Sequence, residues 1–236
     1  MGETAENVAK QWNISREAQD AFAFESQQRY FKALEEGKWK DEIIPVEIAN
    51  GKEKGTFEID EHPRQTTIEK LATLKPAFAK DGTVTAGNSW GINDGAGAML
   101  LASEEAVQKW GLKPIAKIIS MATAGVDPSI MGIGPVPATQ KVLQRASLSI
   151  ADIDLVELNE AFAAQGLACM HVLNLDPQKV NVNGGSIALG HPLGASGLRI
   201  SATLLHEMRR RSSKYGLATM CVGVGQGASI IYENCK

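Results

Sequence analysis

Residues 183–197 read NGGSIALGHPLGASG, with five glycines around a single histidine, His191. Glycine has no side chain and adopts positive φ readily, so such a segment can turn tightly and approach a ligand. The apolar residues that follow are spaced as on one face of a helix: Leu198, Ala202, Leu205 and Met208. The pattern predicts a rigid turn that presents His191 before a helix, the alternative being a glycine-rich connection with a solvated histidine.

Two further polar residues follow short apolar runs. Asn159 ends the run of residues 155–158, and Cys221 precedes a glycine-rich turn that contains Gly223. A histidine, an asparagine and a cysteine at such positions suit thioester or carbon–carbon bond chemistry. Alternatively, Cys221 is a small buried hydrophobic residue and Asn159 only caps a helix. A cysteine hydrolase is disfavoured, because Cys221 is not at a helix N-terminus and no third orienting group is apparent.

Composition narrows the classes of protein. The 236 residues are 44% hydrophobic and 22% charged, as is ordinary for a soluble globular protein. A net charge of −3 argues against a nucleic-acid partner, and no apolar run is long enough for a membrane span. Three cysteines without CxxC spacing argue against a disulfide framework or a metal site. We expect a reducing compartment, the cytoplasm, because no signal peptide is apparent at the first residues.

The order of elements predicts a layered α/β domain in the second half of the chain. Residues 1–36 are expected to form two helices capped by Thr4 and Ser15, and a hairpin is expected with its turn at residues 50–55. A strand at 98–102 should precede a helix that Ser103 caps. The remaining elements expected are strands at 115–122, 155–158, 179–182, 217–222 and 228–232, and helices at 68–74, 139–146, 160–173 and 196–211.

Three signatures resemble those of the thiolase family, most closely its acetyl-CoA acetyltransferase (acetoacetyl-CoA thiolase) type. They are Asn159-Glu160-Ala161-Phe162, the stretch of residues 183–197, and residues 221–227. The resemblance runs along essentially the whole chain and implies a thiolase-like α/β C-terminal domain preceded by a helical and irregular loop domain. In that family two similar α/β halves pack face to face, and the loop domain is inserted into the first.

The resemblance also implies a division of the chain. Residues 1–91 match the loop domain, which binds coenzyme A. Residues 92–111 match the last strand and helix of the first half, and residues 115–236 match the second half.

The implied reaction is a Claisen condensation of two acetyl-CoA to acetoacetyl-CoA and coenzyme A, or the reverse thiolysis, in fatty acid metabolism. Cys221 matches the general base that acts at the α-carbon. His191 matches the histidine that activates the nucleophile and helps to hold the enolate oxygen. Asn159 matches the oxyanion-hole asparagine, which acts through a water, and the Gly223 N–H matches a donor of a second oxyanion hole.

Coenzyme A contacts are implied in the same way, with the thioester as substrate and neither a tightly bound cofactor nor a metal. The positions that match the coenzyme pocket are Met1, Arg64, Leu74, Phe78 and Ala86, with Ala161 and Phe162 beside the thioester. Apolar side chains suit the pantetheine arm, and Arg64 suits the phosphate or adenine end. For Leu74 and Phe78, ordinary core packing is the alternative.

The chain departs from the family pattern in three places. Trp90 stands where a small residue usually faces the pantetheine arm, and Val224 replaces a customary glycine. The nucleophilic cysteine of the family belongs to the first half, and no cysteine here precedes Cys169. We therefore expect the chain alone to form no acyl-enzyme and to expose an apolar face of residues 115–236. Three alternatives follow: the chain is a fragment of a longer enzyme, it pairs with a separate chain that bears the first half, or it is a degenerate protein. The expected partner is an N-terminal thiolase half or a second copy in a homo-oligomer.

Two other functions stay open on these residues. One is a 3-ketoacyl-CoA thiolase of broader chain length. The other is a non-catalytic fragment that binds coenzyme A or a partner chain.

Overall fold

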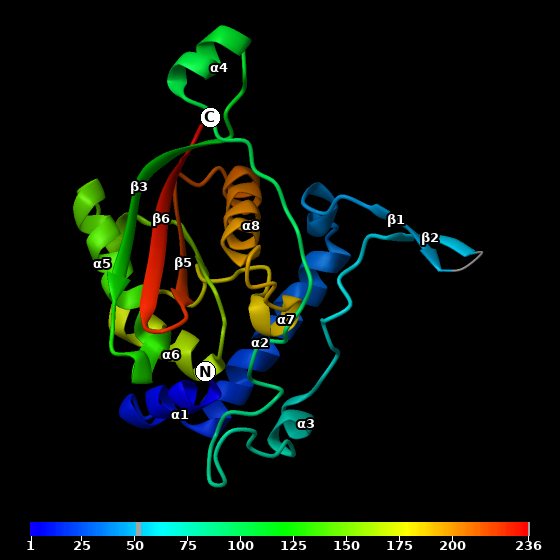
Figure 1. The fold of residues 1–236 in the computed structure, drawn as a ribbon, viewed down its shortest axis with the longest axis vertical. Helices are drawn as coiled ribbons and strands as arrows, with labels where there is room; N and C mark the ends of the chain where they lie inside the picture. Colours follow the sequence, from blue (N-terminus) through cyan, green and yellow to red (C-terminus); the bar gives the residue numbers. More distant parts are fainter. Residues whose placement is uncertain (51–52, 236) are drawn as a thin grey trace.

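A four-stranded mixed sheet, in the order β3–β6–β5–β4, forms the centre of the second half of the chain in this computed structural model (Figure 1). The structure describes residues 1–50 and 53–235. The strands of the sheet are β3 (Ala116–Gly125), β4 (Leu155–Leu158), β5 (Tyr215–Val222) and β6 (Gln226–Asn234). Strands β4 and β5 are parallel, and the other two neighbouring pairs are antiparallel.

Successive residues of the strands point to opposite faces of this sheet. Leu217 and Ile231 join a core with the helices α5 (Pro135–Ala146) and α6 (Ala163–Leu173). Their neighbours Ala218 and Tyr232 instead pack against α8 (Ser196–Arg211). Figure 1 shows α5 and α8 on either side of the sheet. The predicted layered α/β arrangement is confirmed.

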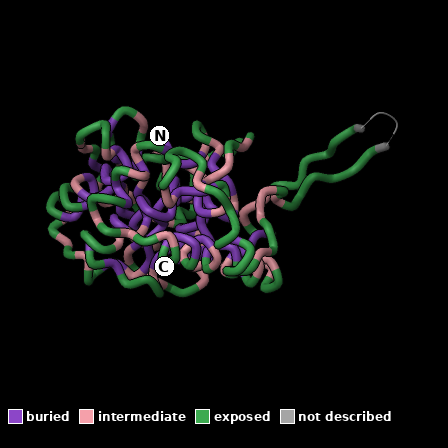
Figure 2. The backbone as a smooth tube through the Cα atoms, turned by 90° about the horizontal axis from the view of Figure 1, so that it is seen from below, coloured by how far each residue is buried: buried purple, intermediate pink, exposed green. Residues whose placement is uncertain are grey.

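The remaining helices are short or lie before the sheet. They are α1 (Gly2–Gln11), α2 (Arg16–Glu35), α3 (Ile68–Ala72), α4 (Glu104–Trp110), α7 (Ser186–Leu189) and three 3₁₀ helices at Lys38–Asp41, Pro128–Ile133 and Ile150–Asp152. An antiparallel hairpin of β1 (Val46–Asn50) and β2 (Glu53–Phe57) extends away from the body of the molecule (Figure 2). No helix in the described ranges is both long and apolar enough to cross a membrane.

Helix α2 is attached to the α/β domain by a buried carboxyl group. The Ser26 hydroxyl donates to Glu160 Oε2 over 2.7 Å, and Asn181 Nδ2 donates to Glu160 Oε1 over 2.8 Å. Burial raises the pKa of Glu160 above its usual range. Because the group is fully enclosed and its oxygens are satisfied, it fixes the loop region against the end of β4.

Two of the predicted helix caps are confirmed and one is wrong. Ser15 and Ser103 accept hydrogen bonds from Ala18 N and Ala106 N, each over 3.2 Å. Thr4 lies inside α1, and its hydroxyl donates to the Met1 carbonyl instead. A threonine within the first turn can thus donate to a preceding carbonyl and does not act as the cap.

The strands expected at 98–102 and 179–182 are not formed. The first segment lies along α8, where Met99 packs on the α8 cluster while Leu100 is 83% exposed, and no strand in the described part of the chain pairs with it. In the second, only Val180 bridges to β4. At Leu158, the Asn181 side chain replaces the backbone hydrogen bonds that a neighbouring strand would make. Its amide oxygen accepts from the Leu158 N–H, and its amide nitrogen donates to the Leu158 carbonyl.

The hairpin forms, but its boundaries differ from those expected. The expected turn includes residues 53–55, whereas the structure places them in β2. Residues 51 and 52 lie outside the described residues.

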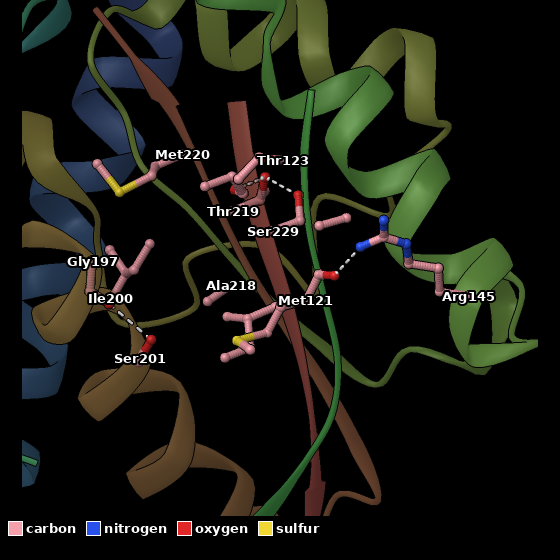
Figure 3. Close-up of a pocket in the computed structure, with 13 residues that line it drawn as sticks. Met121, Thr123, Arg145, Gly197, Ile200, Ser201, Ala218, Thr219, Met220 and Ser229 are labelled. Carbon is pink, nitrogen blue, oxygen red and sulfur yellow. Dashed lines mark hydrogen bonds between the residues drawn. The ribbon is translucent and has the colours of Figure 1, made fainter. Parts of the chain in front are cut away.

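Part of one sheet face is open beside α8. A cavity there has a volume of about 430 Å³ and is lined by β3, β5, β6, the first turns of α8 and Arg145 of α5. Its lining residues are drawn in Figure 3. Met121 on β3 is 60% exposed, whereas Ile200 on α8 is buried. The face left uncovered by α8 is therefore largely apolar, as the sequence predicts.

Candidate functional site

His191 lies in the turn between α7 and α8. Gly190 before it has φ of 89°, and a Cβ there would collide with the Asn93 side chain, so only glycine fits. The His191 N–H donates to the Gly91 carbonyl over 3.1 Å, which ties the turn to the extended segment that follows Trp90. The side chain is 5% exposed. The glycine-rich stretch thus presents a buried imidazole at a fixed turn, as predicted.

The hydrogen bonds of His191 fix its tautomer. Its Nδ1 lies 2.5 Å from Ser196 Oγ, and the Ser196 hydroxyl donates its one proton to the Pro192 carbonyl over 3.0 Å. We assign the hydroxyl proton to the Pro192 carbonyl; Ser196 then accepts from His191, Nδ1 carries the ring proton and Nε2 has the lone pair. Burial, with a smaller effect of the Arg199 charge, lowers the pKa of His191 to about 4. At neutral pH the imidazole is uncharged and Nε2 can accept a proton.

Trp90 connects His191 with the predicted cysteine. Its ring meets the His191 ring edge to face, with 4.8 Å between centroids. The same indole packs on a buried cluster that includes Cys221, Ala161 and Phe162. The backbone N–H of Trp90 donates to the Ala161 carbonyl over 3.2 Å. The structure therefore brings the three predicted signatures to one place, with the indole between them.

Cys221 is near the end of β5, paired with Gly227 of β6, and is 5% exposed. Burial raises the pKa of the Cys221 thiol to about 12. The thiol is therefore protonated at neutral pH and must lose its proton before it can act as a base. Cys169, by contrast, donates its thiol proton to the Gly132 carbonyl inside a closed core, which fits a structural role.

Asn159 directly follows β4, and its N–H donates to the Thr219 carbonyl on β5 over 2.9 Å. Its Oδ1 accepts from the Ser186 hydroxyl over 2.6 Å. Its Nδ2 is fully buried and has no partner among the described residues. An unpartnered buried donor is costly unless a ligand or water meets it. The residue does not cap α6, which begins at Ala163 after Phe162.

The turn between β5 and β6 contains Gly223, Val224 and Gly225. No atom lies within 4 Å of the position a Cβ would take at Gly223, so space is open beside that peptide. Val224 has φ of 67° and is 84% exposed. That conformation favours glycine and is unfavourable for a β-branched residue, so the departure at Val224 strains the turn.

Of the residues predicted to bind coenzyme A, Phe78 lies against Phe162. The ring of Phe78 meets Phe162 edge to face at 6.2 Å and packs on Gly2, the neighbour of Met1. Leu74 lies over Gly87, beside Ala86. Met1, Leu74, Phe78 and Ala86 are all exposed, which is unlike ordinary core packing.

Arg64 is placed differently. It lies in the extended segment before α3, where its N–H donates to Gln27 on α2. Its side chain is exposed, and no contact of the described residues joins it to the apolar set around Phe162.

Some residues at the site were not identified from the sequence. They are Ser186, Ser196, Arg199, Asn93, which packs over Gly190, and His62, whose ring packs on Gly91. Serines and glycines inside a glycine-rich stretch carry no distinguishing signal, because their roles depend on which side chains approach from other elements. Among residues 1–50 and 53–235 no group of His, Cys, Asp or Glu could hold a metal ion.

Comparison with known proteins gives consistent matches along the chain. The family described as "Thiolase, N-terminal domain" matches residues 1–105, and "Thiolase, C-terminal domain" matches residues 112–234. The chain is 54% identical over 235 residues to an acetyl-CoA acetyltransferase of Syntrophomonas wolfei, covering 99% of this chain and 59% of that protein. It is 53% identical over 235 residues to a mitochondrial 3-ketoacyl-CoA thiolase of Rattus norvegicus, with the same coverage.

A solved structure agrees with the fold. The crystal structure of human mitochondrial 3-ketoacyl-CoA thiolase in complex with CoA is 53% identical and superposes with a TM-score of 0.96, covering 100% of this chain and 59% of that one. The chain thus spans about three fifths of the length of the relatives it matches. With both family descriptions matched and the fold shared, the chain belongs to the thiolase family.

Proposed function

We propose that this chain supplies the base, the oxyanion donors and the coenzyme A contacts of a thiolase-type acyltransferase. The proposed reaction condenses two acetyl-CoA to acetoacetyl-CoA and coenzyme A, or runs in reverse as thiolysis. The observation that carries the proposal is the junction around Trp90, where a neutral imidazole with a free Nε2 lies beside the cluster that holds the Cys221 thiol.

The proton chemistry follows from these two groups. A nucleophilic thiol, which would carry the acyl group, loses its proton to His191 Nε2, the only ring nitrogen with a lone pair. Attack of that thiolate on the first acetyl-CoA releases coenzyme A thiolate, which takes the Cys221 proton. The resulting Cys221 thiolate then removes a proton from the α-carbon of the second acetyl-CoA. Because burial raises the pKa of its thiol to about 12, its thiolate is a strong base for a weakly acidic C–H.

The charge that develops on oxygen needs donors. The Nε2–H of protonated His191 and the free Nδ2 of Asn159 are placed to stabilise the enolate oxygen, Asn159 directly or through a water. The open space at Gly223 leaves room for the acyl group whose carbonyl the enolate attacks. When the new C–C bond forms, the nucleophilic thiolate leaves and is reprotonated by His191.

Coenzyme A binding is proposed for the loop region. Met1, Leu74, Phe78 and Ala86 offer exposed apolar surface to the pantetheine arm, which leads to Ala161 and Phe162 at the thioester. Arg64 is proposed for the phosphate or adenine end, where an exposed guanidinium suits an anion.

The nucleophile is proposed to come from a first thiolase half, in the same protein or in a partner chain. Cys169 is closed in the core, where burial raises the pKa of its thiol, and Cys235 lies beyond the end of β6. The open apolar face beside α8 is the surface proposed to receive that half (Figure 3). The division into residues 1–91, 92–111 and 115–236 stays part of this proposal.

Acyl chain length and location are further parts of the proposal. The curated relatives include both acetyl-CoA acetyltransferases and 3-ketoacyl-CoA thiolases at similar identity, so a broader chain length is the second candidate. The cytoplasmic location stays a prediction, because several relatives are named mitochondrial.

The test mixes the 236-residue chain with a separately produced first part of the Syntrophomonas wolfei relative, the part that this chain does not match. Cleavage of acetoacetyl-CoA by coenzyme A is then followed. We expect turnover in the mixture, and a loss of about 10³-fold in Cys221→Ser and His191→Asn. The matched controls are Cys235→Ser and His171→Asn, both at exposed positions. Near-normal turnover in either site variant would contradict the assignment, and coenzyme binding without turnover would favour the non-catalytic function.

A further inference from the structure

We propose that Ser186 and Arg199 are positioning residues that fix the orientation of the Asn159 carboxamide, so that its Nδ2 and not its oxygen is offered to the site. The four groups involved are Glu157, Arg199, Ser186 and Asn159. The orientation of the Asn159 amide is inferred from hydrogen bonds alone. Its role in holding a thioester oxygen rests on the proposed function.

The Ser186 hydroxyl has a single proton, and this determines which end of the Asn159 carboxamide faces it. Arg199 Nη2 lies 3.2 Å from Ser186 Oγ, and arginine can only donate, so the hydroxyl accepts this bond. The single hydroxyl proton is then free to be donated, and Asn159 Oδ1 lies 2.6 Å away. The amide oxygen therefore faces Ser186 and the amide nitrogen faces away from it.

The reversed amide is unfavourable at this place. With Nδ2 toward Ser186, the hydroxyl would face two donors, and its own proton would lose its acceptor. Ser186 and Asn159 are both fully buried, so water does not replace the lost bond cheaply. Ser186 thus discriminates between two orientations that are nearly equal in shape.

Arg199 is itself held on two sides. It lies in the first turn of α8, and its Nη1 is 3.5 Å from Glu157 Oε2 on β4. Glu157 is 3% exposed and comes two residues before Asn159. The hydrogen-bonded chain therefore starts on β4, crosses to α8 and α7, and returns to Asn159, the residue that directly follows β4. Because its two nitrogens contact Glu157 and Ser186, the guanidinium cannot shift without breaking one of these contacts.

The fixed orientation makes the Asn159 side chain selective for ligand groups that accept hydrogen bonds. A fixed Nδ2 offers only donors, which suit a carbonyl or enolate oxygen or the oxygen of a water. A freely rotating amide would present an oxygen for part of the time and repel the same groups. Ser186 is thus expected to raise the affinity for a thioester carbonyl without touching it.

The first experiment uses NMR of the 236-residue chain with labelled asparagine. The two Nδ2 protons of Asn159, identified by their absence in Asn159→Asp, exchange through rotation about the amide C–N bond. A hydrogen bond at Oδ1 slows that rotation because it strengthens the double-bond character. We expect Ser186→Ala to speed the exchange about fivefold, the size of one hydrogen bond.

Two further variants keep the result interpretable. Ser201→Ala is the matched control, because the Ser201 hydroxyl donates to the Gly197 carbonyl on α8 and should leave the rate unchanged. Ser186→Cys, with a weak donor, should give an intermediate rate and serves if Ser186→Ala does not fold. Equal rates in wild type and both Ser186 variants would overturn the proposal.

The second experiment separates this inference from the proposed function. Calorimetry compares acetyl-CoA with coenzyme A, which lacks the carbonyl. We expect Ser186→Ala to lose about threefold to tenfold in affinity for acetyl-CoA and to keep its affinity for coenzyme A. If wild type binds neither compound, the proposed function fails, and the exchange rates still decide the orientation of Asn159.

Discussion

The indole of Trp90 lies edge to face against the imidazole of His191, with 4.8 Å between the ring centroids. This contact places the bulkiest side chain of the site directly beside the imidazole that is proposed to take the nucleophile's proton. Trp90 also packs on the cluster that contains Cys221 and Phe162, so it limits the space into which an acyl chain can extend.

Trp90→Ser should widen that space. We expect the affinity for longer acyl-CoA thioesters to rise by about tenfold relative to acetyl-CoA, because roughly two buried methylenes gain room. Calorimetry with a series of acyl-CoA compounds measures the ratio of the affinity for a longer acyl-CoA to the affinity for acetyl-CoA. Trp110→Ser on α4, where the indole is 69% exposed, is the control and should leave the ratio unchanged. An unchanged ratio in Trp90→Ser would show that the indole does not limit the chain.

Ser196→Ala should release the tautomer of His191. Without the Ser196 acceptor, the proton is no longer held at Nδ1, and a mixture of both neutral tautomers is expected. Long-range ¹⁵N–¹H NMR of labelled histidine reports which nitrogen carries the proton. If Nδ1 stays the only protonated nitrogen in the variant, the Pro192 carbonyl and Ser196 do not control the tautomer.

The pH dependence of stability should carry a contribution from His191. Its folded pKa of about 4 lies below the unfolded value of about 6.5, so the unfolded chain binds the proton more readily. This contribution is present in full above pH 6.5 and is lost as the pH falls toward 4. Urea unfolding of His191→Gln should therefore show a weaker loss of stability over this window than wild type. His171→Gln, an exposed change, should follow wild type; coincident curves for all three would contradict the shift.

Val224→Gly should stabilise the protein. Val224 has φ of 67°, a conformation that costs a β-branched residue about 1 kcal/mol or more and costs glycine little. We expect a gain of about 1 kcal/mol in the free energy of unfolding by urea. Val222→Gly, two residues earlier at the end of β5, is the opposite control and should destabilise. A loss of stability in Val224→Gly would mean that the valine side chain makes a contact worth more than the strain.

Local features of the fold could be read from the sequence where the physical cause is local. Ser15 and Ser103 cap helices because a hydroxyl reaches its own helix N-terminus, and alternation along β5 marks two buried faces. The segment at 98–102 has the same apolar character but forms no strand, since a strand requires a neighbour. At 179–182 the Asn181 side chain replaces the strand bonds, which composition does not reveal.

In the candidate site, too, some features could be predicted from the sequence and others depend on how the elements pack. The placement of His191, Asn159 and Cys221 near element ends follows from glycine and apolar patterns that lie close in sequence. The supporting contacts do not, because Arg199 reaches Ser186 and Trp90 reaches His191 only after separate elements pack. Protonation states depend on these contacts and on burial, so they too become visible only in the folded chain.

The bond from Ser26 to Glu160 joins positions 134 residues apart and lies where solvent does not reach. If the first helices separated from the sheet, the Glu160 carboxyl group would lose its Ser26 partner while buried. The loop region and the α/β domain are therefore expected to melt as one cooperative unit, so the coenzyme-binding surface and the proposed base are not modules that can be exchanged independently.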